Sequence, residues 1–471
     1  MTNRIYFASD RRVHTLLSCS AAVLLSACGA GTPEPGSELP ASIAAQSVHS
    51  DLNASAAPVG ADMTAATPAA EPDAAAVMQA NGETKLLATS VTGASVTPLA
   101  WPASPPCNYY IAPTGSDSGA GTIASPWKTI RFGSAKLTAG KTLCARGGTY
   151  YGQAGAIWKS SGTAKAPVTF RNYPGERPVF DGQWGDTGTH GDFLVFTNNR
   201  NVVVDGITAQ RYADKYGNGT IDLHNGQGPV DNITIQRSTF IDNGSHPNQD
   251  HHIYLATGAS NVTIRNNFFI RAAGSAIQSY HSPASSGIRI YNNVMIGGTL
   301  NCAQSRSNPC PSNMTQHWGL IIGDAKATQI YNNTIYGMQY GIDFNYGTTT
   351  TGPFVVKNNL IVNSTVAGIR VGTAYAPHFT SDYNGFYGNR HDINWKGSNM
   401  SALQFASATS NERHAVRGNP LFVNPAASDF RLHAGSPVID KAAPMTLFNY
   451  DKVGVARPNG YGTDIGAYEW R

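Results

Sequence analysis

Four segments of the chain repeat one short pattern, in which strand-prone residues flank an Asn-Asn pair: VTIRNNFFI (262–270), IRIYNNVMI (288–296), TQIYNNTIY (328–336) and FVVKNNLIV (354–362). The second asparagines of these pairs are 26, 40 and 26 residues apart, and Asn384 follows after 25 more. A period in the twenties, with short strands and turn residues, is typical of a solenoid. Because one repeat cannot bury its own apolar face and stacked repeats can, we expect stacked coils. A turn asparagine in such a stack can hydrogen-bond to the turns above and below it, so we interpret the pairs as structural.

A third short strand is predicted between successive Asn-Asn units. Its copies are TIDLHN from Thr220, HIYLAT from His252, AIQSYH from Ala276, GLIIGD from Gly319, GIDFNY from Gly341 and GIRVGT from Gly368. Three short strands per coil predict an all-β fold, a single-stranded right-handed parallel β-helix. We expect SPWKTIRFGSAKL (125–137) to form an N-terminal capping helix and GTDIGAYEW (462–470) to close the other end. The spacing of 40 requires one insertion, which falls between residues 298 and 317.

The flanks of the repeats resemble those of a known family. YYIAPTGSDSGAGTIASPWKTI (109–130), LCARGGTYYGQ (143–153) and FRLHAGSPVIDKA (430–442) are similar to segments of exported bacterial proteins of the pectate-lyase-like superfamily. The resemblance covers residues 105–471 and implies the parallel β-helix. It leaves the reaction open, because the superfamily includes lyases, hydrolases, epimerases and non-catalytic glycan binders.

The N-terminal residues 1–27 have the features of an export signal, with a basic start and the apolar run AAVLL. The tetrapeptide LSAC (25–28) resembles the lipobox of bacterial lipoproteins. This resemblance implies that Cys28 is lipidated, and that the protein is an exported bacterial lipoprotein of the outer membrane or cell surface, held by an acyl anchor. An export peptide cut near an ordinary cysteine is the alternative.

Composition divides the rest of the chain in two. Residues 29–104 are rich in Ala, Pro, Ser and Thr and lack periodicity, which predicts a disordered tether before a β-helix domain at 105–471. Seven acidic residues oppose a single lysine at 29–100, whereas the whole chain is formally +4, so the folded domain is the basic part. A basic domain suits an acidic polysaccharide. We expect a monomer that binds no nucleic acid and meets the membrane only through its lipid.

The cysteines agree with export. Once Cys19 has left with the signal and Cys28 carries the lipid, four remain. The simplest pairing in an oxidising compartment is Cys107–Cys144 and Cys302–Cys310. No C-x-x-C pair or fixed histidine spacing accompanies them, which argues against a zinc site.

Alternation along the third strands assigns side chains to two faces. Of the twelve inward positions, eleven are apolar, which fixes the register: Ile221, Leu223, Ile253, Leu255, Ile277, Ser279, Leu320, Ile322, Ile342, Phe344, Ile369 and Val371. The central outward column is Asp222, Tyr254, Gln278, Ile321, Asp343 and Arg370, and the next is His224, Ala256, Tyr280, Gly323, Asn345 and Gly372. Before them we place Thr220, His252, Ala276, Gly319, Gly341 and Gly368 outward as well. His251 falls on the preceding turn and is interpreted as a residue without a direct role.

The outward face is predicted to be the substrate cleft, because aromatic residues and glycines there can form a floor for sugar rings. A uronate lyase needs a base, an acid for the leaving oxygen and a group that neutralises the carboxylate. The predicted base and acid come from His252, Tyr254, Tyr280 and His281, and Arg370 or Lys326 is predicted to neutralise the carboxylate or to serve as the base. The predicted substrate contacts are Asp222, His224, Gln278, Asp324, Asp343, Asn345 and Tyr346.

The sequence therefore favours a polysaccharide lyase acting on an acidic, uronate-containing glycan, or a C5-epimerase, which begins with the same proton abstraction. A glycoside hydrolase needs two carboxylates about 5–10 Å apart, and only Asp324 and Asp343 offer such a pair. A non-catalytic surface glycan binder or adhesin is the third alternative. Calcium-dependent pectate lyases of this fold use clustered aspartates, but Asp222 and Asp343 are four coils, about 19 Å, apart. We therefore predict no metal or other cofactor; calcium lacks a supporting acidic cluster.

Overall fold

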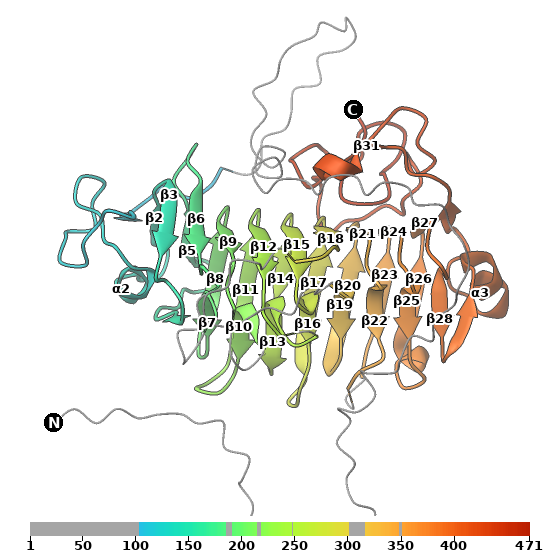
Figure 1. Cartoon of the computed structure of the whole chain (residues 1–471), viewed down its shortest axis with the longest axis horizontal. Coiled ribbons are helices and arrows are strands. Elements are labelled where there is room, and N and C mark those ends of the chain that lie inside the picture. Colours follow the sequence, from blue (N-terminus) through green and yellow to red (C-terminus); the bar gives the residue numbers. More distant parts are fainter. Residues whose placement is uncertain (1–102, 185–190, 214–217, 247, 301–315, 348–350) are drawn as a thin grey trace, which may run out of the picture. The chain divides into compact units, whose positions relative to one another are not determined.

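The computed structural model describes residues 103–184, 191–213, 218–246, 248–300, 316–347 and 351–471. Within them the chain winds through three ten-stranded sheets, visiting each sheet once per coil (Figure 1). Neighbouring strands pair in parallel, apart from the final β28–β29 pair in one sheet. The predicted right-handed parallel β-helix is confirmed.

The three sheets are named here by their strands. Sheet A consists of β1 (Tyr109–Ile111), β2 (Thr142–Ala145), β5 (Val168–Asn172), β8 (Arg200–Asp205), β11 (Asp231–Gln236), β14 (Thr263–Arg265), β17 (Ser285–Tyr291), β20 (Ala325–Tyr331), β23 (Phe354–Lys357) and β26 (Phe379–Asp382). Sheet B consists of β3 (Gly148–Tyr151), β6 (Pro178–Asp181), β9 (Thr208–Gln210), β12 (Thr239–Asn243), β15 (Phe268–Ala272), β18 (Val294–Ile296), β21 (Thr334–Tyr336), β24 (Leu360–Val362), β27 (Gly385–Tyr387) and β30 (Val416–Arg417). Sheet C, which contains the predicted third strands, consists of β4 (Ala156–Ile157), β7 (Leu194–Phe196), β10 (Gly219–His224), β13 (His251–Thr257), β16 (Ser275–Ser279), β19 (Trp318–Ile322), β22 (Tyr340–Phe344), β25 (Ala367–Val371), β28 (Ile393–Trp395) and β29 (Ser398–Met400).

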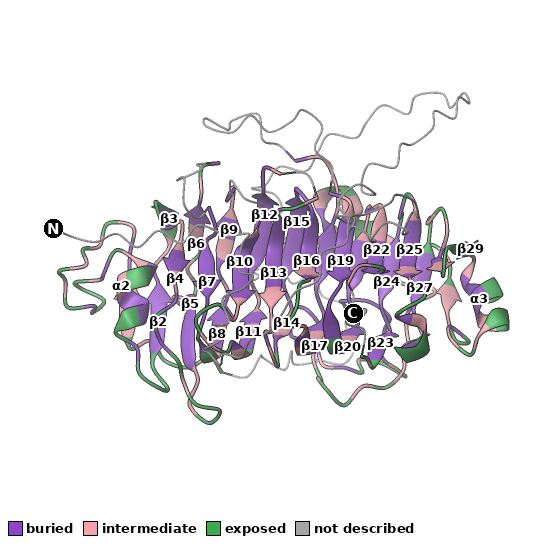
Figure 2. Cartoon of the chain, turned by 90° about the horizontal axis from the view of Figure 1, so that it is seen from below, coloured by how far each residue is buried: buried purple, intermediate pink, exposed green. Residues whose placement is uncertain are grey.

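The predicted inward positions of sheet C lie in the core. Ile221, Ile253, Ile277, Ile342 and Ile369 are fully buried in the main hydrophobic cluster. Because one face of each strand is buried, alternate residues of these strands are apolar, and this pattern was the basis of the predicted register. Figure 2 shows β10, β13, β16, β19, β22 and β25 side by side and largely buried.

The second asparagines form a continuous ladder at the corner between sheets A and B. Nδ2 of Asn267 donates to Oδ1 of Asn293 at 3.0 Å, and Asn293, Asn333 and Asn359 repeat this contact down the stack at 2.9–3.0 Å. Each Nδ2 also donates to a main-chain carbonyl of the preceding coil. The ladder ends at Glu412, which accepts from Asn384 and whose pKa burial raises to about 7. The structural interpretation of the pairs is confirmed.

The first asparagines of the pairs have a separate role. Asn266, Asn292, Asn332 and Asn358 adopt positive φ values of 49–60°, a left-handed turn conformation that asparagine tolerates. Their side chains donate to main-chain carbonyls between residues 443 and 464, so they hold the C-terminal segment, residues 418–471, against the β-helix. This segment, which includes β31 (Phe422–Asn424) and β32 (Asp429–Leu432), runs along the side that bears β18, β21 and β24 (Figure 1).

The ends of the β-helix differ in part from the sequence expectation. The N-terminal helix α2 (Ile130–Ala135) is present, with Thr129 as its N-cap, but it is shorter than the predicted segment. Residues 462–470 do not close the other end; they pack beside Thr334 and Leu360, and α3 (Ala402–Ala408) lies next to β28 and β29 instead. The buried ring of Phe405 contacts Trp395 there, 5.0 Å between centroids.

The Cys107–Cys144 disulfide is present, with Cα atoms 5.6 Å apart. Cys302 and Cys310, the lipobox with Cys28 and almost all of the predicted tether lie outside the described residues. Among the described residues, none of the helices has the length and apolarity that crossing a bilayer requires.

Candidate active site on the outer face of sheet C

The central outward column has the predicted register. Asp222 pairs with Tyr254, Tyr254 with Gln278, Gln278 with Ile321, Ile321 with Asp343, and Asp343 with Arg370. Neighbouring coils are about 4.8 Å apart, so the column is a row of side chains along the helix axis. In the next column the register shifts after Leu223, so His224 faces Thr257 rather than Ala256.

The column that contains His252 and Ala276 faces the core, and not outward as predicted. The ring of His252 lies 6.0 Å from Phe240 and 5.8 Å from Phe269, both core residues, and Ala276 is a core residue too. At the equivalent position Gly341, an added Cβ would meet the carbonyl oxygen of Gly368 at 2.6 Å and a core isoleucine. This column is the second position of the strands, so the alternation of the residues that follow does not extend back to it.

His252 is therefore not an outward proton-transfer group, and its prediction as one is wrong. It is fully buried, its Nδ1 lies 3.0 Å from Nδ2 of Asn243, and burial lowers its pKa to about 3.

The first residue of each of these strands faces outward in its place. Gly219 pairs with His251, Ser275 with Trp318, and Trp318 with Tyr340, and the side chains of this row contact the central column. The ring of His251 lies 5.3 Å from that of Tyr254, and Nε1 of Trp318 donates to Asp343 at 2.8 Å. His251, interpreted from sequence as having no direct role, is thus the histidine beside Tyr254.

Tyr254 is the centre of a cluster of titratable side chains. The His281 ring is 6.3 Å from the Tyr254 ring and 4.5 Å from the Tyr280 ring. Burial, followed by the charge of Asp222 and then by Tyr280, raises the pKa of Tyr254, so its hydroxyl stays protonated near neutral pH. No hydrogen bond joins that hydroxyl to another described residue, which leaves it available to a ligand.

The cluster has an exposed and a covered side. Tyr254 is only 7% exposed, Tyr280 and Gln278 are half-buried, and His281 is exposed. His281 adopts a φ of 80°, a conformation uncommon for a non-glycine residue and often found at functional sites. Oε1 of Gln278 is buried without a hydrogen-bond partner among the described residues, and such atoms call for an explanation.

Asp222 lies on the other side of Tyr254, in the preceding coil. Nε2 of His224 is 3.9 Å from Oδ2 of Asp222, within ion-pair distance if the imidazole is protonated. This places both predicted substrate contacts next to the Tyr254 cluster.

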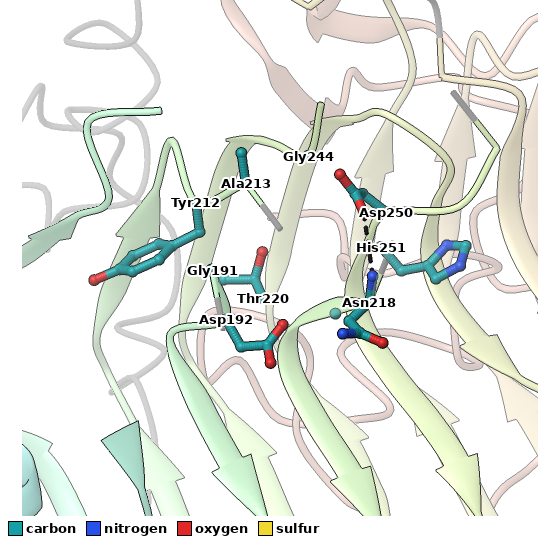
Figure 3. Close-up of a pocket in the computed structure, with 10 residues that line it drawn as sticks. Gly191, Asp192, Tyr212, Ala213, Asn218, Thr220, Gly244, Asp250 and His251 are labelled. Atoms are coloured by element: carbon teal, nitrogen blue, oxygen red, sulfur yellow. Dashed lines mark hydrogen bonds between the residues drawn. The ribbon is translucent and has the colours of Figure 1, made fainter. Parts of the chain in front are cut away.

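A small pocket adjoins the cluster at the start of β10 and β13. It is lined by Asp192, Asn218, Asp250, His251 and neighbouring residues (Figure 3). Oδ1 of Asp250 accepts from the main-chain N–H of Asn218 at 3.1 Å, and Oδ2 accepts from the main-chain N–H of His246. Asp250 therefore connects two loops. Burial raises the pKa of Asp250.

Arg370 belongs to a second cluster, four coils or about 19 Å from Tyr254. Nε of Arg370 donates to Asp343 at 2.8 Å, and Nη2 donates to the same carboxylate and to the hydroxyl of Tyr346 at 2.8 Å. The guanidinium lies 4.0 Å from the centroid of the Tyr340 ring. Because Asp343 is fully buried and occupied by this ion pair, neither residue is placed to act at Tyr254.

The remaining predicted residues are dispersed. Lys326 is exposed on β20 of sheet A, paired with Ser286, and not on the face of sheet C. Asp324 is buried at the end of β19, beside Gly347, and Asn345 is exposed beyond β22. Lys326 is therefore not placed to contact a substrate that lies on Tyr254.

Among the described residues, the acidic side chains are not grouped as a calcium site requires. Within the described ranges, no three His, Cys, Asp or Glu side chains are arranged to hold a metal ion. Asp343 is occupied by Arg370 and Trp318, and Asp250 by main-chain amides. We therefore derive no step through a metal.

Two features of the site escaped sequence reasoning, the outward row containing His251 and Trp318 and the adjoining pocket. The glycines at 319, 341 and 368 were the available signal, because glycine at one position of successive coils indicates a close backbone approach.

The comparisons with known proteins agree with this architecture. Residues 109–280 match the family model described as a Pel9A-like right-handed beta helix region; this range includes Asp222, Tyr254 and Tyr280 and ends one residue before His281. Pectate lyase PEL9 of Emericella nidulans is 41% identical over 83 residues, 18% of this chain and 20% of that protein. The uncharacterized protein YwoF of Bacillus subtilis is 34% identical over 102 residues, 21% of each chain.

The matched stretches thus span about a fifth of the length of these two relatives. The crystal structure of pectate lyase Pel9A superposes with a TM-score of 0.50 at 15% identity, covering 77% of this chain and 96% of that one. At that identity the superposition shows the fold alone. The described strands between residues 109 and 417 form a right-handed parallel β-helix, the fold of Pel9A, and residues 109–280 match the Pel9A-like region.

Proposed function

We propose that the protein acts on an acidic, uronate-containing polysaccharide by abstracting the proton beside the carboxylate, as a lyase or as a C5-epimerase. The observation that carries this proposal is the position of Tyr254 between Asp222 on one side and Tyr280 and His281 on the other, on one outward face. The names of two similar proteins, pectate lyases PEL9 and Pel9A, support the same class of reaction.

Tyr254 is assigned the role of proton donor to the leaving oxygen. An acid must carry its proton at the working pH, and a tyrosine hydroxyl is protonated near neutral pH. Most of the side chain is covered, and its hydroxyl has no partner among the described residues that a substrate would have to displace.

His281 is assigned the role of base. Histidine is the side chain most often used for proton transfer near neutral pH. The ring is exposed, where a substrate can reach it, and it lies beside both Tyr280 and Tyr254. Tyr280, 4.5 Å from it, orients the imidazole or shares the proton.

The carboxylate contact is assigned to Gln278. It is the neighbour of Tyr254 in the next coil, in the central outward column, and its side-chain amide carries N–H donors. An amide N–H can hydrogen-bond to a carboxylate and stabilise the charge that develops next to it. Arg370, the sequence-based candidate, is four coils away and paired with Asp343.

A hydrolase receives less support than a lyase. Its predicted pair required two available carboxylates, and Asp343 is fully buried in its ion pair with Arg370. A glycan binder would not need the titratable cluster around Tyr254.

We further propose that the protein is exported and anchored through a lipid on Cys28. The Cys107–Cys144 disulfide supports an oxidising compartment. Mass spectrometry of the mature N-terminal peptide tests the anchor: a diacylglyceryl modification on Cys28 is expected, and an unmodified cysteine would contradict it.

The reaction is tested with the purified chain on polygalacturonate, alginate and hyaluronan. A lyase produces an unsaturated uronate that absorbs in the ultraviolet, an epimerase changes the C5 signals in the proton spectrum without cleavage, and a hydrolase yields reducing ends alone. Tyr280→Phe and His281→Ala are expected to lose at least about 100-fold in turnover, the usual contribution of an acid–base group. Full activity of both variants would contradict the assignment.

A further inference from the structure

We infer that His251 binds the substrate through its Nε2–H, as a permanently neutral hydrogen-bond donor to a sugar hydroxyl. The inference rests on the proposed function of the same face and goes beyond it, because it assigns a contact and its chemical class to a residue outside the proton-transfer pair.

The tautomer of His251 follows from its contacts. Nδ1 lies 3.1 Å from the main-chain N–H of Ser275 and 2.8 Å from Oγ of the same residue. A main-chain N–H can only donate, so Nδ1 must be the acceptor and carries no proton. In the neutral ring the proton is therefore on Nε2.

The ring stays neutral at working pH. His251 is 3% exposed, and burial lowers its pKa to about 3. A histidine in this state is a poor base, but it donates the same hydrogen bond over the whole range in which the enzyme can act. This separates His251 from His281, which is exposed.

The contacts of the ring place it beside the substrate face. It lies beside the Tyr254 ring and over Gly274, at which an added Cβ would meet Cε1 and Nδ1 of His251 at 2.9 Å. Nε2 has no hydrogen-bond partner among the described residues, and it is not among the fully buried unpartnered atoms. The Nε2–H of His251, beside Tyr254, therefore has no acceptor among the described residues.

The charges nearby select the acceptor. Asp192 and Asp250 line the pocket that adjoins His251 (Figure 3), and Asp222 pairs with Tyr254 in the preceding coil. These carboxylates disfavour a uronate carboxylate near His251. The ring points away from the pocket in Figure 3, and a neutral sugar hydroxyl on that side can accept from Nε2–H.

The test is a nitrogen-15 spectrum of the full chain labelled at histidine, with the His251 signals identified by their loss in His251→Gln. Between pH 8 and pH 5, signals of a neutral Nε2–H ring that do not titrate are expected. Titration in this range, or a proton on Nδ1, would overturn the inference whatever the enzyme does.

The binding step uses the Tyr254→Phe variant with a uronate oligomer that the wild type converts, and then the carboxyl-reduced, neutral form of that oligomer. If the wild type converts none of the glycans, the proposed function fails, and the titration is run with unconverted oligogalacturonate and oligoalginate. Both charged and reduced oligomers are expected to shift the His251 Nε2–H signal. Loss of the shift on reduction would mean that His251 binds the carboxylate, and a ligand that shifts His281 but not His251 would also overturn the inference.

Kinetics provide a matched comparison. His251→Gln is expected to raise KM or lower kcat/KM by about 10-fold, the value of one neutral hydrogen bond, while the pH at half-maximal activity stays unchanged. His433→Gln, an exposed histidine on the C-terminal segment, is the control and should match the wild type. A displaced acid limb in His251→Gln would identify His251 as the base instead.

Discussion

Replacing Tyr254 with phenylalanine removes only the hydroxyl that is assigned as the proton donor. An acid–base group contributes about 10²–10⁴ in rate, or about 2.7–5.5 kcal/mol at 1.36 kcal/mol for each factor of ten. The hydroxyl makes no hydrogen bond to a described residue, so the native state loses no internal partner and the free energy of unfolding should change by less than about 0.5 kcal/mol. We expect a fall of at least 100-fold in kcat with little change in KM, because the ring that contacts the sugar remains.

The assay follows unsaturated product at saturating and at limiting substrate, together with the melting temperature. Tyr387→Phe is the matched control, since Tyr387 is an exposed tyrosine on β27 of sheet B, away from the proposed face. Retention of more than about a third of wild-type kcat by Tyr254→Phe would refute the assignment of Tyr254. A large loss of stability in this variant would show that its hydroxyl has a structural role.

Three further predictions concern residues that hold the fold. The native pKa of His252 is depressed to about 3, so the unfolded state binds the extra proton between pH 6.5 and pH 3 and stability falls as pH falls through this window. His252→Met should therefore make the slope of unfolding free energy against pH shallower by up to about 1.4 kcal/mol per pH unit, measured by urea unfolding; an unchanged slope would contradict the assigned burial. Asn333→Ala removes four side-chain hydrogen bonds of the ladder and should cost about 4 kcal/mol, whereas the exposed Asn399→Ala should cost less than about 0.5. Arg370→Met leaves the Asp343 carboxylate buried without its cationic partner and should lower the free energy of unfolding by about 3–5 kcal/mol. The double variant that adds Asp343→Leu should regain this stability. A normal melting temperature together with a raised KM would indicate instead that Arg370 contacts the substrate.

The sequence was sufficient for the fold because its signals are local and repeated. Asn-Asn at a period in the twenties identified the corner between sheets A and B, where the second asparagine stacks on its neighbours. Alternating apolar residues fixed the register of sheet C, so the pairing of Asp222, Tyr254 and Gln278 follows from the sequence.

The candidate site was predicted only in part, because the alternation does not extend to the first two residues of the strand. His251 and His252 both belong to β13, but their side chains exchange faces relative to the alternation of the residues that follow. The ion pair of Arg370 was also beyond sequence reasoning. Outward position alone does not distinguish a charge that awaits a ligand from one that the next coil already neutralises.

A crystal structure of the Tyr254→Phe variant with a bound uronate oligomer tests the central claim most directly. The account predicts that the sugar chain lies along the outer face of sheet C across β10, β13 and β16, with one uronate between position 254 and His281 and its carboxylate near Gln278. An oligomer bound on sheet A or sheet B, or on the Arg370 cluster with the Tyr254 cluster empty, would contradict it.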